Sequence, residues 1–210
     1  MIEPQLTMPE WVHYDDASHT YTVDGVVQPS VSTILSVIDP DKYAGIREDV
    51  LARAAARGSA THGMIALDVR DDLDVGSLEG NLVEDYLSWQ KFCDDLGFEC
   101  EYSERVVASK KDAYCGTLDL VGKLTKHKKK KGRWMVDIKR TAARPDMVDI
   151  QTAGYNVAAA ESLPDYDPAT PRGCLWIRGD RYEFFELTSP SDFAMFRSGL
   201  NIYNYRHRRK

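Results

Sequence analysis

The sequence predicts a mixed α/β domain. Apolar residues recur at helical spacing through much of the first hundred residues, and three segments rich in apolar and aromatic residues, typical of strands, follow between residues 99 and 140. Another helix, two strands and a last helix are expected after them, without an internal repeat. With 210 residues, of which 43% are hydrophobic, the chain can bury a sizeable core, and we expect one domain over residues 1–210.

The N-terminal segment predicts two small elements. Tyr21–Val27 alternates about Asp24-Gly25, which is typical of a tight hairpin. Ser30 can cap a short helix that ends before Asp39-Pro40. We expect the hairpin and the helix, both within residues 1–40, to pack against the rest of the domain.

Two longer helices are expected next. The first runs from about Arg47 to Leu67, and His62 lies on its apolar or small stripe, which is formed by Leu51, Ala54, Ala55, Gly58 and Ile65. The second runs from Leu78 to Leu96, with Ser77 as its cap and Gly97 as its stop. Its expected buried face consists of Leu78, Leu82, Tyr86, Trp89, Cys93 and Leu96.

Three strands should follow, over Glu99–Ser109, Cys115–Leu124 and Arg133–Arg140. Strand alternation would place Glu104 on the apolar face of the first strand, with Cys100, Tyr102, Val106 and Ala108. Asp137 and Lys139 are two residues apart and should project from the same face of the third strand. A lysine-rich loop, KHKKKKGR, joins the second strand to the third.

The last third of the chain predicts a helix, a hairpin and a helix. The first helix follows Pro145, with Asp146 as its cap, and stops at Leu163-Pro164. Gln151 and Tyr155 lie four residues apart on one face of it. Strands over Gly173–Arg178 and Tyr182–Leu187 would form a hairpin around Gly179-Asp180, and a final helix would run from Ser191 into the basic residues 206–210.

Charge and composition narrow the class of protein. The net charge of −6 argues against binding nucleic acid by bulk charge alone, although residues 126–133 and 206–210 form local basic patches. No apolar run approaches the ~20 residues that span a bilayer, and Met1–Glu10 lacks the features of a signal peptide. We therefore expect a cytoplasmic protein with no membrane partner. The four cysteines form no CxxC pair, which argues against a zinc or iron–sulfur site.

Two short acidic motifs point to metal chemistry. Gly116–Asp119 reads GTLD and Asp137–Lys139 reads DIK, on strands expected to be neighbours. Carboxylates are the hard oxygen ligands that hold divalent metals, which assist phosphodiester hydrolysis. A lysine beside them can orient water or stabilise developing negative charge.

The order of the motifs resembles a known family. The chain carries RGxxxH (Arg57, Gly58, His62), Glu104, GxxD at Asp119, DxK at Asp137 and Lys139, and QxxxY at Gln151 and Tyr155. This series resembles the PD-(D/E)xK nuclease superfamily, specifically its RecB-like exonuclease branch, which is common in phages and includes mitochondrial genome maintenance exonucleases. The segment Gly25–Leu35 is similar to phage members as well, so the resemblance spans roughly Tyr21–Tyr155.

The resemblance implies a fold and a set of site residues. The fold would be restriction-endonuclease-like, a central mixed sheet flanked by helices. One or two Mg²⁺ or Mn²⁺ ions would be held by His62, Asp119, Asp137 and the main-chain carbonyl of Ile138, with Glu104 beside them. Lys139 would be the catalytic lysine, and Gln151 and Tyr155 would support the site or touch DNA. Some relatives carry a four-cysteine iron–sulfur cluster, but the cysteine spacing here does not match, so none is expected.

The resemblance also implies a function. We expect a metal-dependent DNA exonuclease of DNA recombination or repair that hydrolyses phosphodiester bonds by two-metal, water-mediated attack. Its partners would be DNA and a single-strand annealing protein or recombinase, in the host cytoplasm if the chain comes from a phage. Two alternatives stay open: a structure-selective endonuclease on the same fold, and an inactive DNA-binding accessory protein.

Some residues have a simpler interpretation. His62 on an apolar stripe and Tyr155 could each be core residues. The lysines of the loop, Lys128, Lys129, Lys130 and Lys131, either contact DNA or form a solvated hairpin tip.

Overall fold

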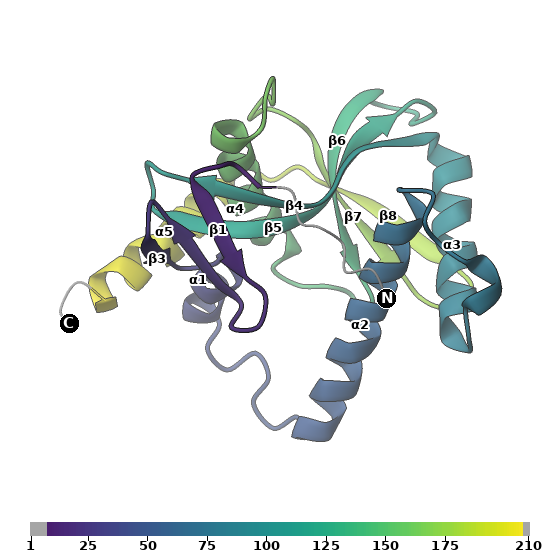
Figure 1. The fold of residues 1–210 in the computed structure, drawn as a ribbon, viewed down its shortest axis with the longest axis horizontal. Helices are drawn as coiled ribbons and strands as arrows, with labels where there is room; N and C mark the ends of the chain where they lie inside the picture. The colour runs from purple at the N-terminus through teal and green to yellow at the C-terminus, as the bar shows by residue number, and fades with distance from the viewer. Residues whose placement is uncertain (1–7, 208–210) are drawn as a thin grey trace.

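The computed structural model describes residues 8–207, and it confirms a mixed α/β architecture (Figure 1). A five-stranded sheet has the order β4-β5-β6-β7-β8, in which only β6 and β7 pair in parallel. A separate antiparallel sheet has the order β1-β2-β3. The strands are β1 Val12–Asp15, β2 Thr20–Val23, β3 Val26–Gln28, β4 Phe98–Ser109, β5 Tyr114–Leu124, β6 Gly132–Lys139, β7 Arg172–Ile177 and β8 Tyr182–Leu187.

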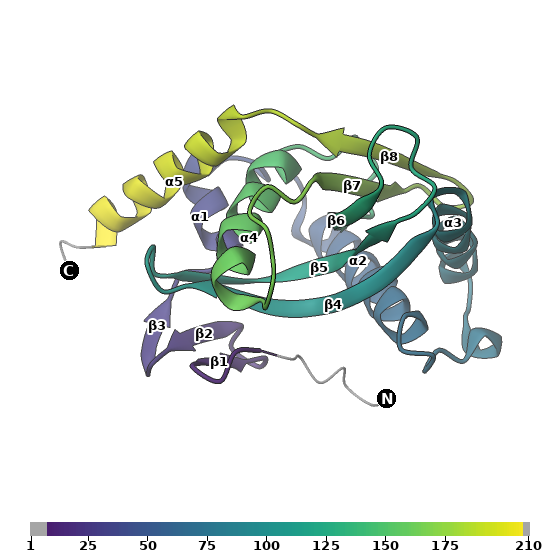
Figure 2. The ribbon, with the colours of Figure 1, turned by 90° about the horizontal axis from the view of Figure 1, so that it is seen from above.

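Helices cover both faces of the large sheet. They are α1 Val31–Ile38, α2 Glu48–Asp68, α3 Asn81–Leu96, α4 Val148–Ser162 and α5 Ser191–His207, with one 3₁₀ turn at Val75–Ser77. Figures 1 and 2 show α1, α4 and α5 grouped toward one end of the molecule and α2 and α3 toward the other. In the part of the chain that is described, no helix is long and apolar enough to cross a membrane.

The N-terminal elements form as the sequence predicts, with one addition. β2 and β3 pair as a hairpin around Asp24 and Gly25, which both adopt the positive φ that such a turn requires. The side chain of Ser30 caps α1 by accepting a hydrogen bond of 3.0 Å from the backbone N–H of Thr33. The sequence did not predict β1, which completes the small sheet.

Helix α2 is confirmed, but its first half is not buried as predicted. Ala54 and Ala55 are exposed, and the buried residues begin at Thr61 and continue through Met64, Ile65 and Ala66. Figure 1 shows the N-terminal half of α2 projecting beyond the sheet, away from the other labelled helices and strands. His62 therefore lies near the point where the helix first meets the sheet.

Helix α3 begins three residues later than predicted. Ser77 ends the 3₁₀ turn instead of capping a helix, and Gly80, with φ 55°, occupies the N-cap of α3. The helix stops at Gly97 as expected, in the left-handed conformation. The predicted face does meet the core: Trp89 is buried, and Leu78, Leu82, Tyr86, Cys93 and Leu96 are half-buried against it. The prediction missed Asp85, Ser88 and Phe92, which are buried as well.

The predicted alternation of the first long strand is broken. Tyr102 packs against the cluster formed by α1 and α4, whereas Val106 and Ala108 pack against the N-terminal sheet on the opposite face. A register shift lies between Cys100 and Tyr102, and Glu104 has a positive φ of 46°. These irregularities turn the strand over, which a strict two-residue period cannot anticipate.

The C-terminal elements are confirmed except for one cap. Met147, with φ 55°, precedes α4, and Asp146 forms an ion pair of 2.7 Å with Lys42 instead of capping the helix. The β7–β8 hairpin and α5 form as predicted. The last residues of the predicted basic tail, Arg208–Lys210, lie outside the described residues.

Two apolar clusters fill the spaces between the sheet and its helices. One joins α1, α4 and α5 to the sheet through residues such as Ile34, Leu118 and Phe196. The other joins α2 and α3 to it through residues such as Ile65 and Trp89. On β5 the two clusters meet between Leu118, which belongs to the first, and Leu120, which belongs to the second.

A buried ion pair joins β7 to α5 and generates a first prediction. Arg172 and Asp192 are both 4% exposed, and their charged groups lie 2.7 Å apart. Replacing Asp192→Ala leaves a buried guanidinium without its counter-charge, so we expect the free energy of unfolding, measured in urea, to fall by about 3–5 kcal/mol. Asp94→Ala, at an exposed position of α3, is the control and should change it by less than about 0.5 kcal/mol. Equal effects of the two substitutions would contradict this prediction.

Candidate metal centre

The candidate centre forms where β5 and β6 separate. Their pairing runs from Leu124 opposite Gly132 to Leu120 opposite Val136, and then stops. The next free amide of β6, that of Ile138, donates a hydrogen bond of 2.6 Å to Oδ2 of Asp119. The carbonyl oxygen of Ile138 lies 3.1 Å from Nε2 of His62, which donates to it. Side chains thus take the place of backbone partners on this edge of β6.

In both β4 and β5 the side chains change from one face of the sheet to the other near Asp119. In β5, Leu118 and Leu120 are two residues apart but belong to the clusters on opposite sides of the sheet. In β4, the positive φ of Glu104 falls between Ser103, which is opposite Leu120, and Arg105, which is opposite Leu118. The break places the carboxylates of Glu104 and Asp119 beside each other on adjacent strands.

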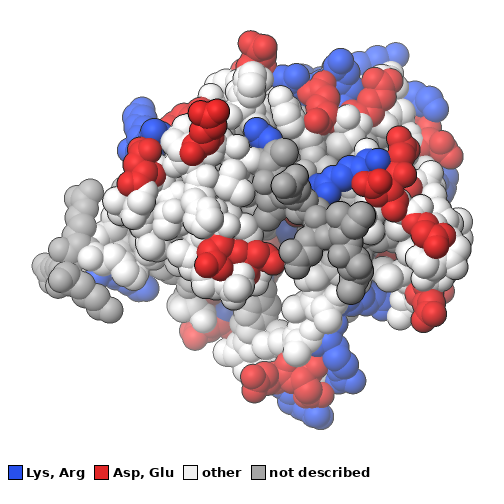
Figure 3. Space-filling view, in the orientation of Figure 1, with Lys and Arg blue, Asp and Glu red and all other residues white. Residues whose placement is uncertain are grey.

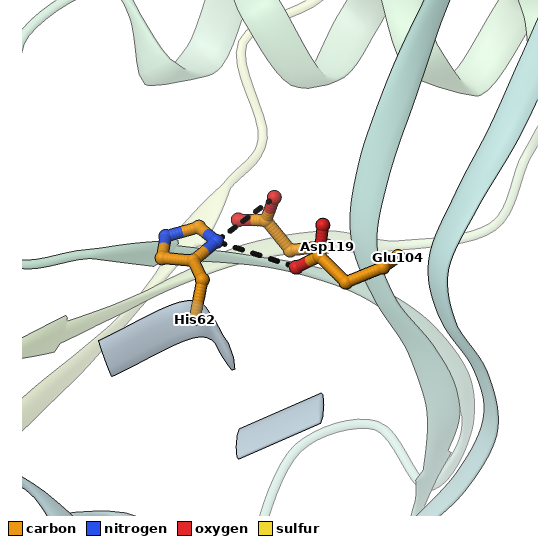
Figure 4. Close-up of side chains that lie close together, drawn as sticks. All are labelled: His62, Glu104 and Asp119. Atoms are coloured by element: carbon orange, nitrogen blue, oxygen red, sulfur yellow. Dashed lines mark ion pairs between the residues drawn. The ribbon is translucent and has the colours of Figure 1, made fainter. Parts of the chain in front are cut away.

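His62 meets these two carboxylates from α2 (Figure 4). Its Nδ1 lies 3.4 Å from Oε1 of Glu104 and 3.6 Å from Oδ1 of Asp119. One potential ligand atom from each of the three side chains lies within 4.8 Å of the others. The carbonyl of Ile138 adjoins the group through its contact with His62. The structure therefore brings together four of the five ligands expected from the sequence.

The electrostatics of the cluster favour a bound positive charge. Burial by itself would lower the pKa of His62, but the carboxylates of Asp119 and Glu104 outweigh it and raise that pKa to about 9. Burial raises the pKa of Asp119 against the opposing effect of His62 and Lys139. Two carboxylates so close together in a poorly solvated position need a cation between them, which protonated His62 supplies in the absence of a metal ion.

Asp137 and Lys139 form a second group next to the first. The Lys139 Nζ lies 2.6 Å from Oδ2 of Asp137, which confirms that they share a face of β6. Asp137 is 2% exposed, and neither of its oxygens accepts a hydrogen bond of normal geometry from the described residues. Burial raises its pKa to about 6 in spite of Lys139, and the carboxylates of Asp137 and Asp119 raise the pKa of Lys139 although burial opposes it. Asp137 does not join the three-residue cluster of His62, Glu104 and Asp119.

Gln151 and Tyr155 lie on one face of α4, as predicted. The amide Nε2 of Gln151 donates to the Tyr155 hydroxyl over 3.1 Å. The ring of Tyr155 is buried against Gly116 at the start of the GTLD motif, where an added Cβ would lie 2.6 Å from Cε1 of Tyr155. Glycine is therefore required at position 116 for the tyrosine to approach β5.

The structure also contains a buried carboxylate that the sequence analysis missed. Asp85 of α3 accepts hydrogen bonds from Oγ1 of Thr61 at 2.9 Å and from Nε of Arg140 at 2.8 Å. Arg57, the arginine of RGxxxH, lies 3.7 Å from the same carboxylate. Asp85 thereby ties α2, one residue before His62, to the chain directly after Lys139. The only sequence signal was an acid at helical spacing within an otherwise apolar face.

The lysines of the loop are not part of this centre. β5 ends five residues after Asp119, at the end of the strand away from Lys139. The loop residues that follow it there include Lys128, Lys129, Lys130 and Lys131. Five strand residues span about 17 Å. Lys129 forms an ion pair of 3.2 Å with Glu186. In Figure 3 basic side chains, with acidic ones among them, gather at the top right, where Figure 1 places this loop. Contact of these lysines with DNA stays a prediction.

Comparisons with known proteins add no relative: no protein-family model matches the chain, and no curated protein matches it.

The geometry of His62 generates a second prediction. If His62 holds a metal ion, His62→Ala should weaken Mn²⁺ binding at least about tenfold in titration calorimetry, because one donor of the cluster is lost. The melting temperature of the metal-free protein should fall as well, because Glu104 and Asp119 lose the counter-charge of protonated His62, so the decisive readout is the Mn²⁺ affinity. His13→Ala, at an exposed position of β1, is the matched control and should leave Mn²⁺ binding unchanged. A large loss of stability with unchanged Mn²⁺ affinity would show that His62 is a structural residue.

Proposed function

We propose that this protein is a divalent-metal-dependent DNA exonuclease on a restriction-endonuclease-like fold. The observation that carries the proposal is the cluster of His62, Glu104 and Asp119 beside the Asp137–Lys139 pair, at the point where β5 and β6 separate. The order of these residues along the chain, which resembles the RecB-like exonuclease branch, supports it as well.

The donor set fits Mg²⁺ or Mn²⁺. Two carboxylates and a main-chain carbonyl are hard oxygen ligands that suit both ions, and the imidazole nitrogen of His62 favours the transition metal Mn²⁺ over Mg²⁺. Oδ2 of Asp137 is ion-paired with Lys139, whereas Oδ1 has no hydrogen-bond partner among the described residues and supplies a further acceptor next to the cluster. A bound ion of this kind would neutralise charge on a phosphodiester and lower the pKa of water.

The protein's own groups have separable tasks. Glu104, Asp119 and the Ile138 carbonyl would bind the ion, and His62 would join them after releasing its proton. Lys139, held by Asp137 at 2.6 Å, would place a positive charge beside the scissile phosphate and stabilise its negative charge in the transition state. Asp85 would be a positioning residue that does not touch the substrate, because its hydrogen bonds fix α2 and the end of β6 relative to each other.

A site recessed beside the N-terminal sheet favours action at strand ends. His62 and Glu104 line a cleft of about 730 Å³ together with Tyr14 and Tyr21 of the small sheet. A strand end can enter such a cleft, whereas a continuous duplex would have to be deformed to reach the cluster.

The third prediction tests whether cleavage starts at DNA ends or within a continuous strand. With Mg²⁺ or Mn²⁺, the protein should degrade linear DNA and leave the covalently closed circle of the same sequence intact, followed over time on a gel. Nicking of the circle at a rate similar to the loss of linear DNA would favour a structure-selective endonuclease. Absence of cleavage of both forms, with DNA bound, would show an accessory protein without turnover.

The fourth prediction separates metal binding from the role of the lysine. Lys139→Ala should retain Mn²⁺ binding in calorimetry but reduce the cleavage rate at least about 100-fold, as loss of one charge-stabilising group does in other enzymes. Asp119→Asn should lose both Mn²⁺ binding and cleavage. Lys91→Ala, on the exposed face of α3, is the control for both. Cleavage by Lys139→Ala at the wild-type rate would remove Lys139 from the mechanism.

A further inference from the structure

Two clefts adjoin the candidate metal centre, and Ser32 at the start of α1 lines both of them. The first, called here the aromatic cleft, has a volume of about 730 Å³ and includes Tyr14, His19 and Tyr21 as well as His62 and Glu104. The second, called here the basic cleft, has a volume of about 560 Å³ and includes Lys42, Lys139, Arg144 and Gln151. Residues of the candidate centre thus line both clefts, His62 and Glu104 the first and Lys139 the second.

The aromatic cleft presents ring surfaces from the N-terminal sheet. The rings of Tyr14 and Tyr21 lie 4.6 Å apart between centroids, and the Tyr14 hydroxyl is 2.7 Å from Nδ1 of His19. The Tyr21 hydroxyl is hydrogen-bonded to Thr117 of β5 at 2.8 Å, which ties the rings to the strand that carries Asp119. These contacts hold Tyr14 in place, while its ring and the exposed His19 still face the cleft.

Another part of the lining of the aromatic cleft comes from α2. Besides His62 it consists of residues with small side chains, among them Gly58 and Gly63. A Cβ added at either glycine would meet no atom of the described residues within 4 Å. A planar group can therefore lie against α2 in this cleft without displacing a side chain of residues 8–207.

Charge distinguishes the two clefts. No lysine or arginine lines the aromatic cleft within the described residues, and its charged groups besides His62 are the carboxylates of Asp16 and Glu104. Lys42, Lys139 and Arg144 line the basic cleft, where Asp39 and Asp146 are the acids. In the basic cleft Lys42 is ion-paired with Asp146 and Lys139 with Asp137, so their charges are partly balanced, but lysine and arginine side chains remain there to donate hydrogen bonds to a phosphate. The aromatic cleft offers a phosphate carboxylates instead, whereas a neutral nucleobase suits its aromatic walls.

We propose that the aromatic cleft binds one unpaired nucleobase of a single DNA strand, stacked on Tyr14 with His19 beside it, while the backbone of that strand crosses the metal centre into the basic cleft. This inference rests on the proposed nuclease function and names its substrate as a strand whose end is unpaired. Tyr14 and His19 would be binding residues that recognise the presence of a base but not its identity, because every base offers a π face.

The test compares two oligonucleotides with the same number of phosphates. One is an oligothymidylate and the other carries abasic residues throughout, and binding of each to the full chain is measured by fluorescence anisotropy in EDTA, where no metal-dependent cleavage occurs. The wild-type protein should bind the oligothymidylate at least about fivefold more tightly, the lower end for one base stacked on an aromatic ring.

Matched variants assign this preference to the rings. Tyr14→Leu keeps an apolar contact with Tyr21 but removes the ring, so the affinity ratio should fall toward one, whereas Tyr14→Phe keeps the ring and should keep the ratio. His19→Asn tolerates the φ of 48° at this position and should lower the ratio in part. Lys42→Ala should weaken binding of both oligonucleotides by the same factor and leave the ratio unchanged.

The outcomes separate this inference from the proposed function. A wild-type ratio of one, or an unchanged ratio in Tyr14→Leu, would overturn the base-binding cleft even if the protein cleaves DNA. A ratio that depends on Tyr14 would support it even if the protein cleaves no DNA with Mn²⁺, a result that would by itself overturn the nuclease function.

Discussion

The separation of β5 from β6 at Asp119 is the constraint on which the candidate site depends. A buried backbone N–H must find a partner, and once the ladder ends at Leu120 the amide of Ile138 finds the carboxylate of Asp119. The same break leaves the Ile138 carbonyl free for His62 and brings Asp119 beside Glu104. Local irregularity in two strands therefore assembles carboxylates, an imidazole and a carbonyl that a regular sheet would have kept apart.

Contacts from the surrounding helices fix the positions of β5 and β6 around the site. The Asp85 carboxylate accepts hydrogen bonds from Thr61 on α2 and Arg140 after β6, and it therefore connects the helix that carries His62 to the strand that carries Asp137 and Lys139. Tyr155, packed on Gly116, holds α4 against β5 on the other face. Fixed supports of this kind allow several like-charged groups to remain close together, because their repulsion cannot be relieved by movement of the backbone.

Much of this arrangement could be predicted from the sequence because it depends on local patterns. Helical spacing placed His62 on the stripe of α2, and the two-residue period placed Asp137 and Lys139 on one face, where the structure has them paired. The sequence did not predict the features that depend on tertiary contacts. The exposed start of α2 follows from the extent of the sheet, and the inverted face of Tyr102 follows from the backbone of Glu104. The buried role of Asp85 depends on two arginines distant in sequence, which a helical period does not reveal.

The central claim is that a divalent cation binds where β5 and β6 separate, and diffraction tests it most directly. Crystals grown with Mn²⁺ would be measured above and below the manganese absorption edge, which identifies the metal by its anomalous signal and locates it without reference to activity. We expect a peak that lies among the side chains of His62, Glu104 and Asp119 and disappears in crystals of Asp119→Asn. Peaks elsewhere, with none among these three side chains in well-ordered wild-type crystals, would contradict the account.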